Sequence, residues 1–263
     1  MKIGIDIQGI QSDASRERGI GRYSLNLITH LITLYPDHQY ILVANASLTN
    51  VESFVSKSIS NTSANYSYVE WFAPCPTKKN KFSLGKTRNV RSALYSYTLS
   101  SLNLDCLLIT SFFEGFNDNA LVEFDHSFDL PKIVTIFYDL IPLLKPENYL
   151  DQNPFFKKFY LKKIDEIKKL DGFLAISESS AKEACDSLHI DENLVKNISS
   201  ACDNHLFNTN KKTNCITKSK NLISLEPYLL YAGAGDSRKN LKRLVQAYSL
   251  LPGKLRNKYN LVI

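Results

Sequence analysis

Short apolar, β-branched segments alternate with helical patterns along most of this chain, and this alternation limits the possible folds more than any other feature. The segments KIGIDIQ, QYILVAN, YSYVEWF, DCLLIT, KIVTIFY and GFLAIS have the length and composition of strands. Their near-continuous apolarity is typical of strands covered on both faces, as in a parallel sheet. The pattern therefore predicts an α/β fold with a doubly wound, mostly parallel sheet.

Helical patterns lie between these segments. In Tyr23–Leu34, one face carries Leu27, Ile28, Leu31 and Leu34. A second helix is predicted over Phe155–Leu170, with an apolar stripe of Phe156, Phe159, Tyr160, Ile164 and Ile167. Ser180 and Glu183 have the spacing of a capping box, which predicts the start of a further helix there.

The composition of the 263 residues changes towards the C-terminus. We expect a Rossmann-like N-terminal domain over residues 1–203, followed by a polar linker over residues 204–225. Residues 226–263 have a strand, helix, strand pattern, which predicts the incomplete β-α-β start of a second Rossmann-like domain. A piece of about 40 residues does not normally bury a core alone, so we expect the second domain to be truncated.

Cysteine, histidine and hydropathy patterns exclude several classes of protein. Five widely spaced cysteines without a C-x-x-C pair fit a reducing cytoplasm and disfavour a disulfide framework or a zinc site. The five histidines have no ligand spacing, so we expect no metal. No run approaches the roughly 18 apolar residues that span a bilayer, and no signal peptide is evident.

The net charge of +6 is concentrated in one segment. Residues 75–102 contain no acid and six basic residues: Lys78, Lys79, Lys81, Lys86, Arg88 and Arg91. Such a cluster suits nucleic acid, acidic lipid or a phosphorylated substrate, and a solvated surface is the alternative.

The segment RGIGRY follows the first strand and precedes a helix. Gly19 and Gly21 resemble the start of a dinucleotide fingerprint, but Ser24 stands where the third glycine belongs. This disfavours an NAD-dependent oxidoreductase. We expect a flexible loop whose N–H groups, with the helix N-terminus, point across the carboxyl edge of the sheet, where open α/β sheets bind ligands. The alternative is a turn that needs glycine only for its backbone geometry.

Acidic and aromatic residues follow two predicted strands directly. Tyr138 and Asp139 come after KIVTIF, and Glu114 follows DCLLIT by a few residues. All three are therefore expected at the same carboxyl edge. An acid there suits a site, although a helix or turn cap is the alternative.

The third glycine-rich element, YAGAGDSRKN, lies in the second predicted domain. Gly233 and Gly235 allow a tight turn after a strand, and Arg238 and Lys239 stand just before a helix. Two cations beside a helix N-terminus suit a diphosphate. A solvated basic pair is the alternative.

Together these elements resemble family 4 of the glycosyltransferases, whose GT-B fold has two Rossmann-like domains. The resemblance runs over nearly the whole chain, through RGIGRYSLNL, YDLIPLLKPENYL, AISESSAKE, ISSACDNHLF and YAGAGDSRKNLKRLVQAYSLL. Within the family the chain looks most like bacterial enzymes, often mannosyltransferases, that build O-antigen or related polysaccharides. The family's E-x7-E donor segment does not occur before residue 263, which agrees with the expected truncation.

The resemblance implies a retaining hexosyltransferase that needs no metal or cofactor. Its donor is a nucleotide sugar such as GDP-mannose, whose diphosphate contacts Gly19, Gly21, Arg238 and Lys239. Catalytic roles fall to Tyr138, which replaces a histidine common in relatives, and Asp139. Ala234 replaces an arginine of many relatives, which removes one phosphate contact.

The acceptor implied by the resemblance is a lipid-linked oligosaccharide or a polysaccharide. Glu114 and the six basic residues of 75–102 are then expected to face the acceptor or an anionic membrane, rather than nucleic acid. The expected location is the cytoplasm, peripheral to the inner face of the membrane. The alternative function is an inactive acceptor- or membrane-binding module left by truncation.

Overall fold

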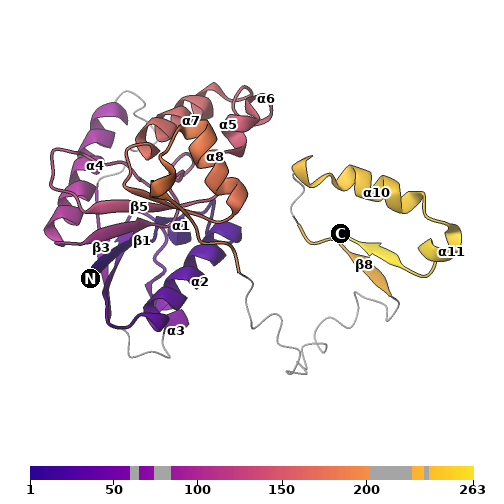
Figure 1. Ribbon diagram of the computed structural model, residues 1–263, viewed down its shortest axis with the longest axis horizontal. Coiled ribbons are helices and arrows are strands. Elements are labelled where there is room, and N and C mark those ends of the chain that lie inside the picture. Colours follow the sequence, from indigo (N-terminus) through magenta and orange to yellow (C-terminus); the bar gives the residue numbers. More distant parts are fainter. Residues whose placement is uncertain (60–64, 74–83, 202–226, 234–236) are drawn as a thin grey trace. The chain divides into compact units, whose positions relative to one another are not determined.

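A computed structural model describes residues 1–59, 65–73, 84–201, 227–233 and 237–263 (Figure 1). The chain divides into two compact units, Met1–Asp203 and Asn204–Ile263, which are treated separately below.

Seven parallel strands form one sheet in the first unit, in the order β3-β2-β1-β4-β5-β6-β7. The strands are β1 (Lys2–Asp6), β2 (Gln39–Asn45), β3 (Tyr66–Trp71), β4 (Cys106–Ile109), β5 (Lys132–Phe137), β6 (Gly172–Ala175) and β7 (Val195–Asn197). The predicted doubly wound α/β fold is confirmed, and each predicted strand segment contains a strand. The sequence did not indicate β7, because it has only three residues and two of them are polar.

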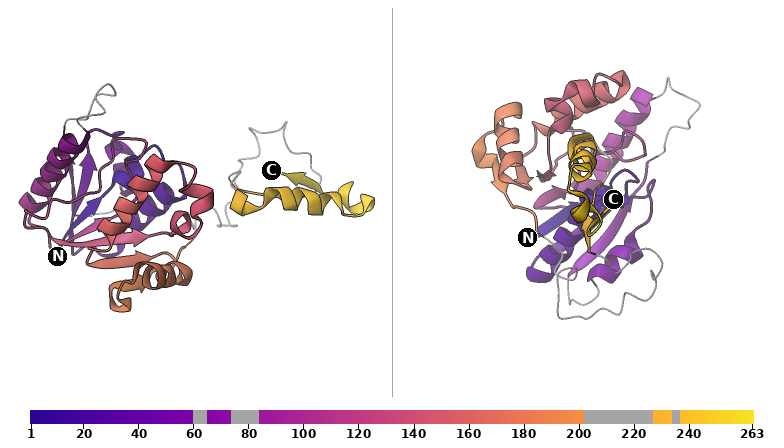
Figure 2. Two further views of the ribbon diagram at one scale, coloured as in Figure 1. Left: turned by 90° about the horizontal axis from the view of Figure 1, so that it is seen from above. Right: turned by 90° about the vertical axis from the view of Figure 1, so that its right-hand side faces the viewer.

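Helices cover both faces of this sheet. The longer ones are α2 (Gly19–Leu34), α3 (Glu52–Ile59), α4 (Leu84–Ser101), α7 (Pro154–Ile167) and α8 (Glu178–Leu188). Short turns of helix, α1 (Gln8–Gln11), α5 (Ile141–Leu144), α6 (Pro146–Tyr149) and the 3₁₀ turn η2 (Glu192–Leu194), lie in the connections. Figures 1 and 2 show α2 and α3 on one side of the sheet and α4, α7 and α8 on the other.

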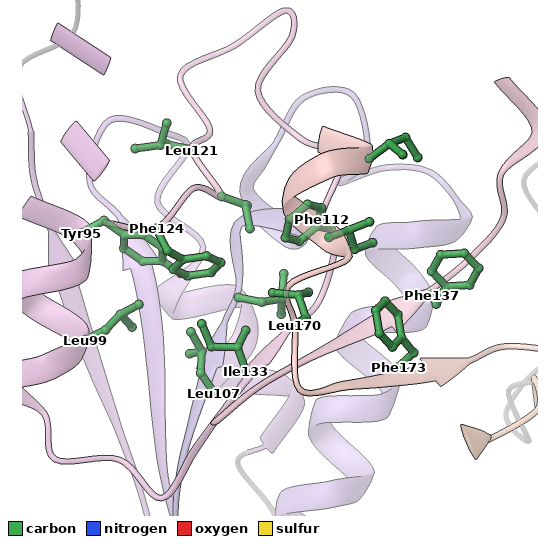
Figure 3. Packing of buried hydrophobic residues seen from close by; sticks show 14 of the residues in the cluster. Tyr95, Leu99, Leu107, Phe112, Leu121, Phe124, Ile133, Phe137, Leu170 and Phe173 are labelled. Carbon is green, nitrogen blue, oxygen red and sulfur yellow. The ribbon is translucent and has the colours of Figure 1, made fainter. Parts of the chain in front are cut away.

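Two hydrophobic cores result, because side chains along a strand point alternately to opposite faces. In β2, Tyr40 and Leu42 join the core under α2 and α3, whereas Ile41 and Val43 join the other. Figure 3 shows this second core, where Leu99 of α4 lies beside Leu107 and other buried residues of the sheet. Strands covered on both faces explain the near-continuous apolar runs.

Two predicted helix details are wrong. The helix α2 begins at Gly19, so Gly19, Ile20 and Gly21 are helical and do not form a flexible loop. The buried face of the helix is Gly21, Ser24, Ile28 and Ile32. Leu34 is 66% exposed, because it falls outside this face. The N-cap of α8 is Ser177, whose hydroxyl accepts from the N–H of Ser180, so the helix starts earlier than the capping-box spacing indicated.

The apolar stripe of α7 packs against the second core as predicted, but one lysine packs with it. Lys163 is 1% exposed, and its Nζ donates a 2.6 Å hydrogen bond to the carbonyl oxygen of Val122. The same Nζ lies 5.0 Å from the centre of the Phe112 ring. These contacts explain how a cation is tolerated in an apolar interface.

The second unit contains a parallel pair of strands, β8 (Tyr228–Leu230) and β9 (Asn260–Val262). Between them lie the 3₁₀ turn η4 (Ser237–Lys239) and the helices α10 (Leu241–Ser249) and α11 (Gly253–Arg256). The expected strand, helix, strand order is therefore present. The predicted linker over residues 204–225 lies outside the described residues.

Candidate active site at the switch point of the sheet

The order of the strands reverses between β1 and β4, since β2 and β3 lie to one side and β5 to β7 to the other. Open α/β sheets bind ligands at the carboxyl ends of the strands beside such a switch point. The segments that follow β1, β4 and β5 begin at this edge, and they contain most of the residues predicted for the first unit.

Gly21 is needed for close backbone packing. Its N–H donates a 3.0 Å hydrogen bond to the carbonyl oxygen of Ser15. A Cβ atom at Gly21 would lie 2.3 Å from the carbonyl oxygen of Arg16. Backbone geometry therefore explains Gly21, and its N–H is not available to a phosphate.

Gly19 differs, because a Cβ atom there would meet no atom within 4 Å. It is the first residue of α2, and the preceding Arg18 makes no side-chain capping bond. Within the part of the chain that the structure describes, the N–H groups of Gly19 and Ile20 have no acceptor. Arg18 and Arg22 are exposed beside them. A helix N-terminus with open N–H groups and two nearby cations suits an anion.

Glu114 lies in the segment after β4 and is only 6% exposed. Its Oε1 accepts hydrogen bonds from the hydroxyl of Ser15 and, at 2.7 Å, from the hydroxyl of Ser111. Gly115 follows with a φ of +100°, and a Cβ atom there would lie 2.2 Å from the carbonyl oxygen of Ala120. Only glycine fits this turn, which brings Glu114 to the loop that follows β1.

Tyr138 lies in the same region. Its hydroxyl donates to the carbonyl oxygen of Thr110 at 3.2 Å and lies 3.1 Å from the hydroxyl of Ser24 on α2. Burial raises the pKa of Tyr138 well above its usual range, and the negative charge of Glu114 adds to this. Tyr138 therefore keeps its proton at neutral pH, which suits a hydrogen-bonding role.

Asp139 forms a turn directly after β5. Its Oδ1 accepts a 3.1 Å hydrogen bond from the N–H of Ile141, as in an Asx turn. This contact corresponds to the turn-cap alternative considered from the sequence. Helix α8 fixes the same segment, since the hydroxyl of Ser180 donates to the carbonyl oxygen of Tyr138 at 2.5 Å and Glu183 accepts from the N–H of Leu140 at 2.9 Å.

A buried polar network beneath this edge was missed from the sequence. Asp6, at the end of β1, accepts from the Tyr95 hydroxyl at 2.6 Å and from the Gln8 amide at 2.9 Å. Gln8 also bonds the backbone of Leu121 and the side chain of Asn45. Burial raises the pKa of Asp6, although the hydrogen bonds from Tyr95 and Gln8 oppose the shift. The single acid within the apolar segment IGIDI was the only signal of this network.

The predicted basic surface is only partly described. Lys78, Lys79 and Lys81 lie outside the described residues, and Lys86 and Arg88 lie in α4 with side chains that are likewise not described. Arg91 is 8% exposed, and its Nη2 donates a 2.5 Å hydrogen bond to the carbonyl oxygen of Asn119. The prediction that the Arg91 side chain faces the acceptor or a membrane is therefore wrong, because its guanidinium is buried and bonds the loop after β4.

In the second unit, Arg238 and Lys239 are exposed and lie at the end of the 3₁₀ turn η4, close to the start of α10. Asn240 separates them from the helix with a φ of 52°, and its side chain does not cap the helix. This geometry agrees with two cations beside a helix N-terminus. Ala234 and Gly235 lie outside the described residues.

Known proteins that resemble this chain are bacterial mannosyltransferases. The chain is 30% identical over 266 residues to the serotype-specific mannosyltransferase WbdA of Escherichia coli, covering 100% of this chain and 31% of that protein. It is 24% identical over 247 residues to the O-antigen chain mannosyltransferase B of Escherichia coli, covering 93% of this chain and 60% of that protein. The chain is a homologue of the O-antigen mannosyltransferases.

The chain spans about a third of the length of WbdA. No family model matches it. No helix among the described residues is long and apolar enough to cross a membrane.

Solved structures of glycosyltransferases share the fold of this chain. The lipopolysaccharide outer core galactosyltransferase WaaB superposes with a TM-score of 0.52 at 13% identity, covering 99% of this chain and 60% of that one. Anabaena HepE, solved in complex with UDP, gives a TM-score of 0.50 at 13% identity, covering 99% of this chain and 68% of that one. The parallel sheet predicted for the N-terminal domain of a GT-B fold is therefore confirmed.

Proposed function

We propose that this homologue forms the acceptor side, and one corner of the donor side, of a retaining glycosyltransferase. The reaction transfers a hexose, which we take to be mannose, from a nucleoside-diphosphate sugar to a glycan acceptor. The observation that carries the proposal is the sheet edge where the open N-terminus of α2 and Glu114 are joined through Ser15. The relationship to mannosyltransferases along the whole chain supports the choice of sugar.

The diphosphate leaving group would be stabilised by N–H groups and cations. Each unit by itself has groups of this kind: the first has the N–H groups of Gly19 and Ile20, and the second has Arg238 and Lys239 with the N-terminus of α10. Preorganised donors of this kind stabilise charge that develops in the transition state. We propose that these groups stabilise the leaving group without a bound metal. We propose GDP-mannose as the donor.

Tyr138 and Asp139 would line the space beside the transferred sugar. Tyr138 holds a proton on its hydroxyl and donates it in a hydrogen bond, while Asp139 keeps the segment after β5 in a fixed turn. The acceptor would be a lipid-linked oligosaccharide or a polysaccharide. A lipid-linked acceptor would bring the protein to the inner face of the membrane.

A transfer assay with the purified full-length gene product tests this proposal. We expect hexose transfer from GDP-mannose to an oligosaccharide acceptor, with the anomeric configuration of the donor retained in the product by NMR. Replacing Arg238 and Lys239 together with alanine should raise the donor KM by about tenfold or more, since each charge-assisted contact contributes roughly 1.5–3 kcal/mol. Lys254→Ala, which removes an exposed cation from α11, is the matched control.

Two results would contradict the proposal. One is a product with inverted configuration. The other is a folded protein that transfers no sugar from any nucleotide donor and only sediments with anionic vesicles, which is the behaviour of a binding module.

A further inference from the structure

Glu114 is held by two neutral donors at one oxygen. The hydroxyl of Ser15, from the loop after β1, and the hydroxyl of Ser111, from the segment after β4, both donate to Oε1. Among the described residues, no lysine or arginine forms an ion pair with this carboxylate. The side chain is therefore fixed in orientation while its negative charge is not neutralised.

The second oxygen of Glu114 is open to a ligand. Among the described residues, no group donates a hydrogen bond to Oε2. This oxygen is also not completely shielded from solvent. A carboxylate that is 6% exposed needs donors for its remaining lone pairs. Because an ionised carboxylate only accepts hydrogen bonds, the group that contacts Oε2 directly is better a hydroxyl, which donates, than a phosphate oxygen, which does not.

Ser15 joins Glu114 to the start of α2. Its hydroxyl donates to Glu114, and its carbonyl oxygen accepts from the N–H of Gly21. A hydroxyl ligand at Glu114 would thus lie beside the helix end proposed to bind the donor diphosphate. A glycosyltransferase requires this order, with the acceptor hydroxyl next to the donor sugar and its leaving group.

We propose that Glu114 is a specificity-determining residue that accepts hydrogen bonds from the hydroxyl groups of a neutral sugar at the end of the acceptor. Ser15 and Ser111 are positioning residues for it. The inference rests on the proposed function and refines it: the recognised part of the acceptor is the uncharged sugar, and any phosphate of a lipid-linked acceptor lies elsewhere.

Glu114→Gln is the most informative variant. The two serine hydroxyls need an acceptor, so they select the amide oxygen and leave the NH₂ group facing the ligand. The substitution thereby replaces an acceptor that faces the ligand with a donor, with little change in the shape of the side chain. Glu192→Gln, an exposed acid in η2, is the matched control.

The experiment measures binding of mannobiose and of mannose phosphate to the 263-residue chain by calorimetry and saturation-transfer NMR. We expect mannobiose to bind more tightly than mannose phosphate, Glu114→Gln to weaken mannobiose binding at least tenfold, and Glu192→Gln to leave it unchanged. Ser111→Ala should cause a smaller loss, and it also covers the case in which Glu114→Gln fails to fold.

Three outcomes would overturn the inference: equal binding of mannobiose by the native chain and the folded variants, tighter binding of mannose phosphate, or no binding of mannobiose. The proposed function fails in a different way. Binding of mannobiose that depends on Glu114, without any hexose transfer, would contradict the transferase proposal and still support the sugar site.

Discussion

The N–H of Gly21 donates a 3.0 Å hydrogen bond to the carbonyl oxygen of Ser15, and this contact closes the loop after β1 onto the first turn of α2. A Cβ atom at Gly21 would lie 2.6 Å from the same oxygen, so the loop and the helix fit together only with glycine there. Gly19, two residues earlier, has open space around it. The two glycines of the motif therefore have different roles.

Alanine at each glycine should separate these roles. Gly21→Ala should lower the free energy of unfolding by about 1–3 kcal/mol, because the new methyl group meets backbone atoms that cannot rotate away. Gly19→Ala should leave stability unchanged or raise it by up to about 1 kcal/mol, since alanine favours a helix. Urea denaturation measures both values. Equal destabilisation by the two changes would contradict the packing described for Gly21.

Gly19→Ala also tests the proposed donor contact. If a phosphate approaches the N–H of Gly19, the methyl group fills the space that the phosphate needs. The folded variant should then have a raised KM for the nucleotide sugar and an unchanged melting temperature. A donor KM equal to that of the native protein would place the diphosphate elsewhere.

The buried pair of Tyr95 and Asp6 should give a pH-dependent stability. Burial raises the pKa of Asp6 in the folded state, so the folded chain favours the protonated acid and stability falls as pH rises from the ordinary aspartate range through the raised pKa. The hydrogen bond from Tyr95 opposes this shift. Tyr95→Phe removes the bond, so it should cost about 1–3 kcal/mol at neutral pH and less in acid.

Denaturation of Tyr95→Phe across a series of pH values checks this expectation. Tyr97→Phe is the matched control, because Tyr97 lies on the same helix and is 60% exposed. If the free energy of unfolding lost in Tyr95→Phe does not grow with pH, the hydrogen bond from Tyr95 does not stabilise the ionised form of Asp6.

The order of strands and helices along the sequence predicted the parallel sheet and the edge at which the candidate site lies. Tyr138 and Glu114 could be predicted because each follows an apolar strand, and parallel strands end at one edge. The strand order supplied what the sequence lacks, namely that the loops after β1 and β4 meet. The contact of Glu114 with Ser15 joins residues 99 positions apart, and no local pattern indicates such a pair.

The positions of charged residues in the sequence were the least reliable basis for predicting which side chains lie on the surface. Arg91 belongs to the basic segment that was expected to face the acceptor or a membrane, and Lys163 lies in a helix predicted only from its apolar stripe. Each of them donates to a carbonyl oxygen of the segment after β4. A long side chain buries its apolar stem and needs only one acceptor for its charged end. Composition does not reveal such an acceptor, since it comes from a loop distant in sequence.

Arg91→Ala follows from this correction. The change should lower the free energy of unfolding by about 1.5–3 kcal/mol, because it removes a charge-assisted hydrogen bond in a buried position. Sedimentation with anionic vesicles should stay the same. Arg22→Ala, on the exposed side of α2, is the control and should hardly affect stability. Reduced vesicle binding by folded Arg91→Ala would restore a membrane-facing role.

The contact between α8 and the segment after β5 gives the last prediction. Glu183 accepts from the N–H of Leu140, a residue that is 0% exposed. Glu183→Ala leaves this N–H without an acceptor and should cost about 1–3 kcal/mol, whereas Glu183→Gln keeps an acceptor oxygen and should cost less. Because the same segment holds Tyr138, the alanine variant should also lower kcat more than it changes the donor KM. Lys182→Ala, an exposed neighbour on α8, should alter neither quantity, and equal kcat values for Glu183→Ala and Lys182→Ala would contradict the positioning of Tyr138 by this helix.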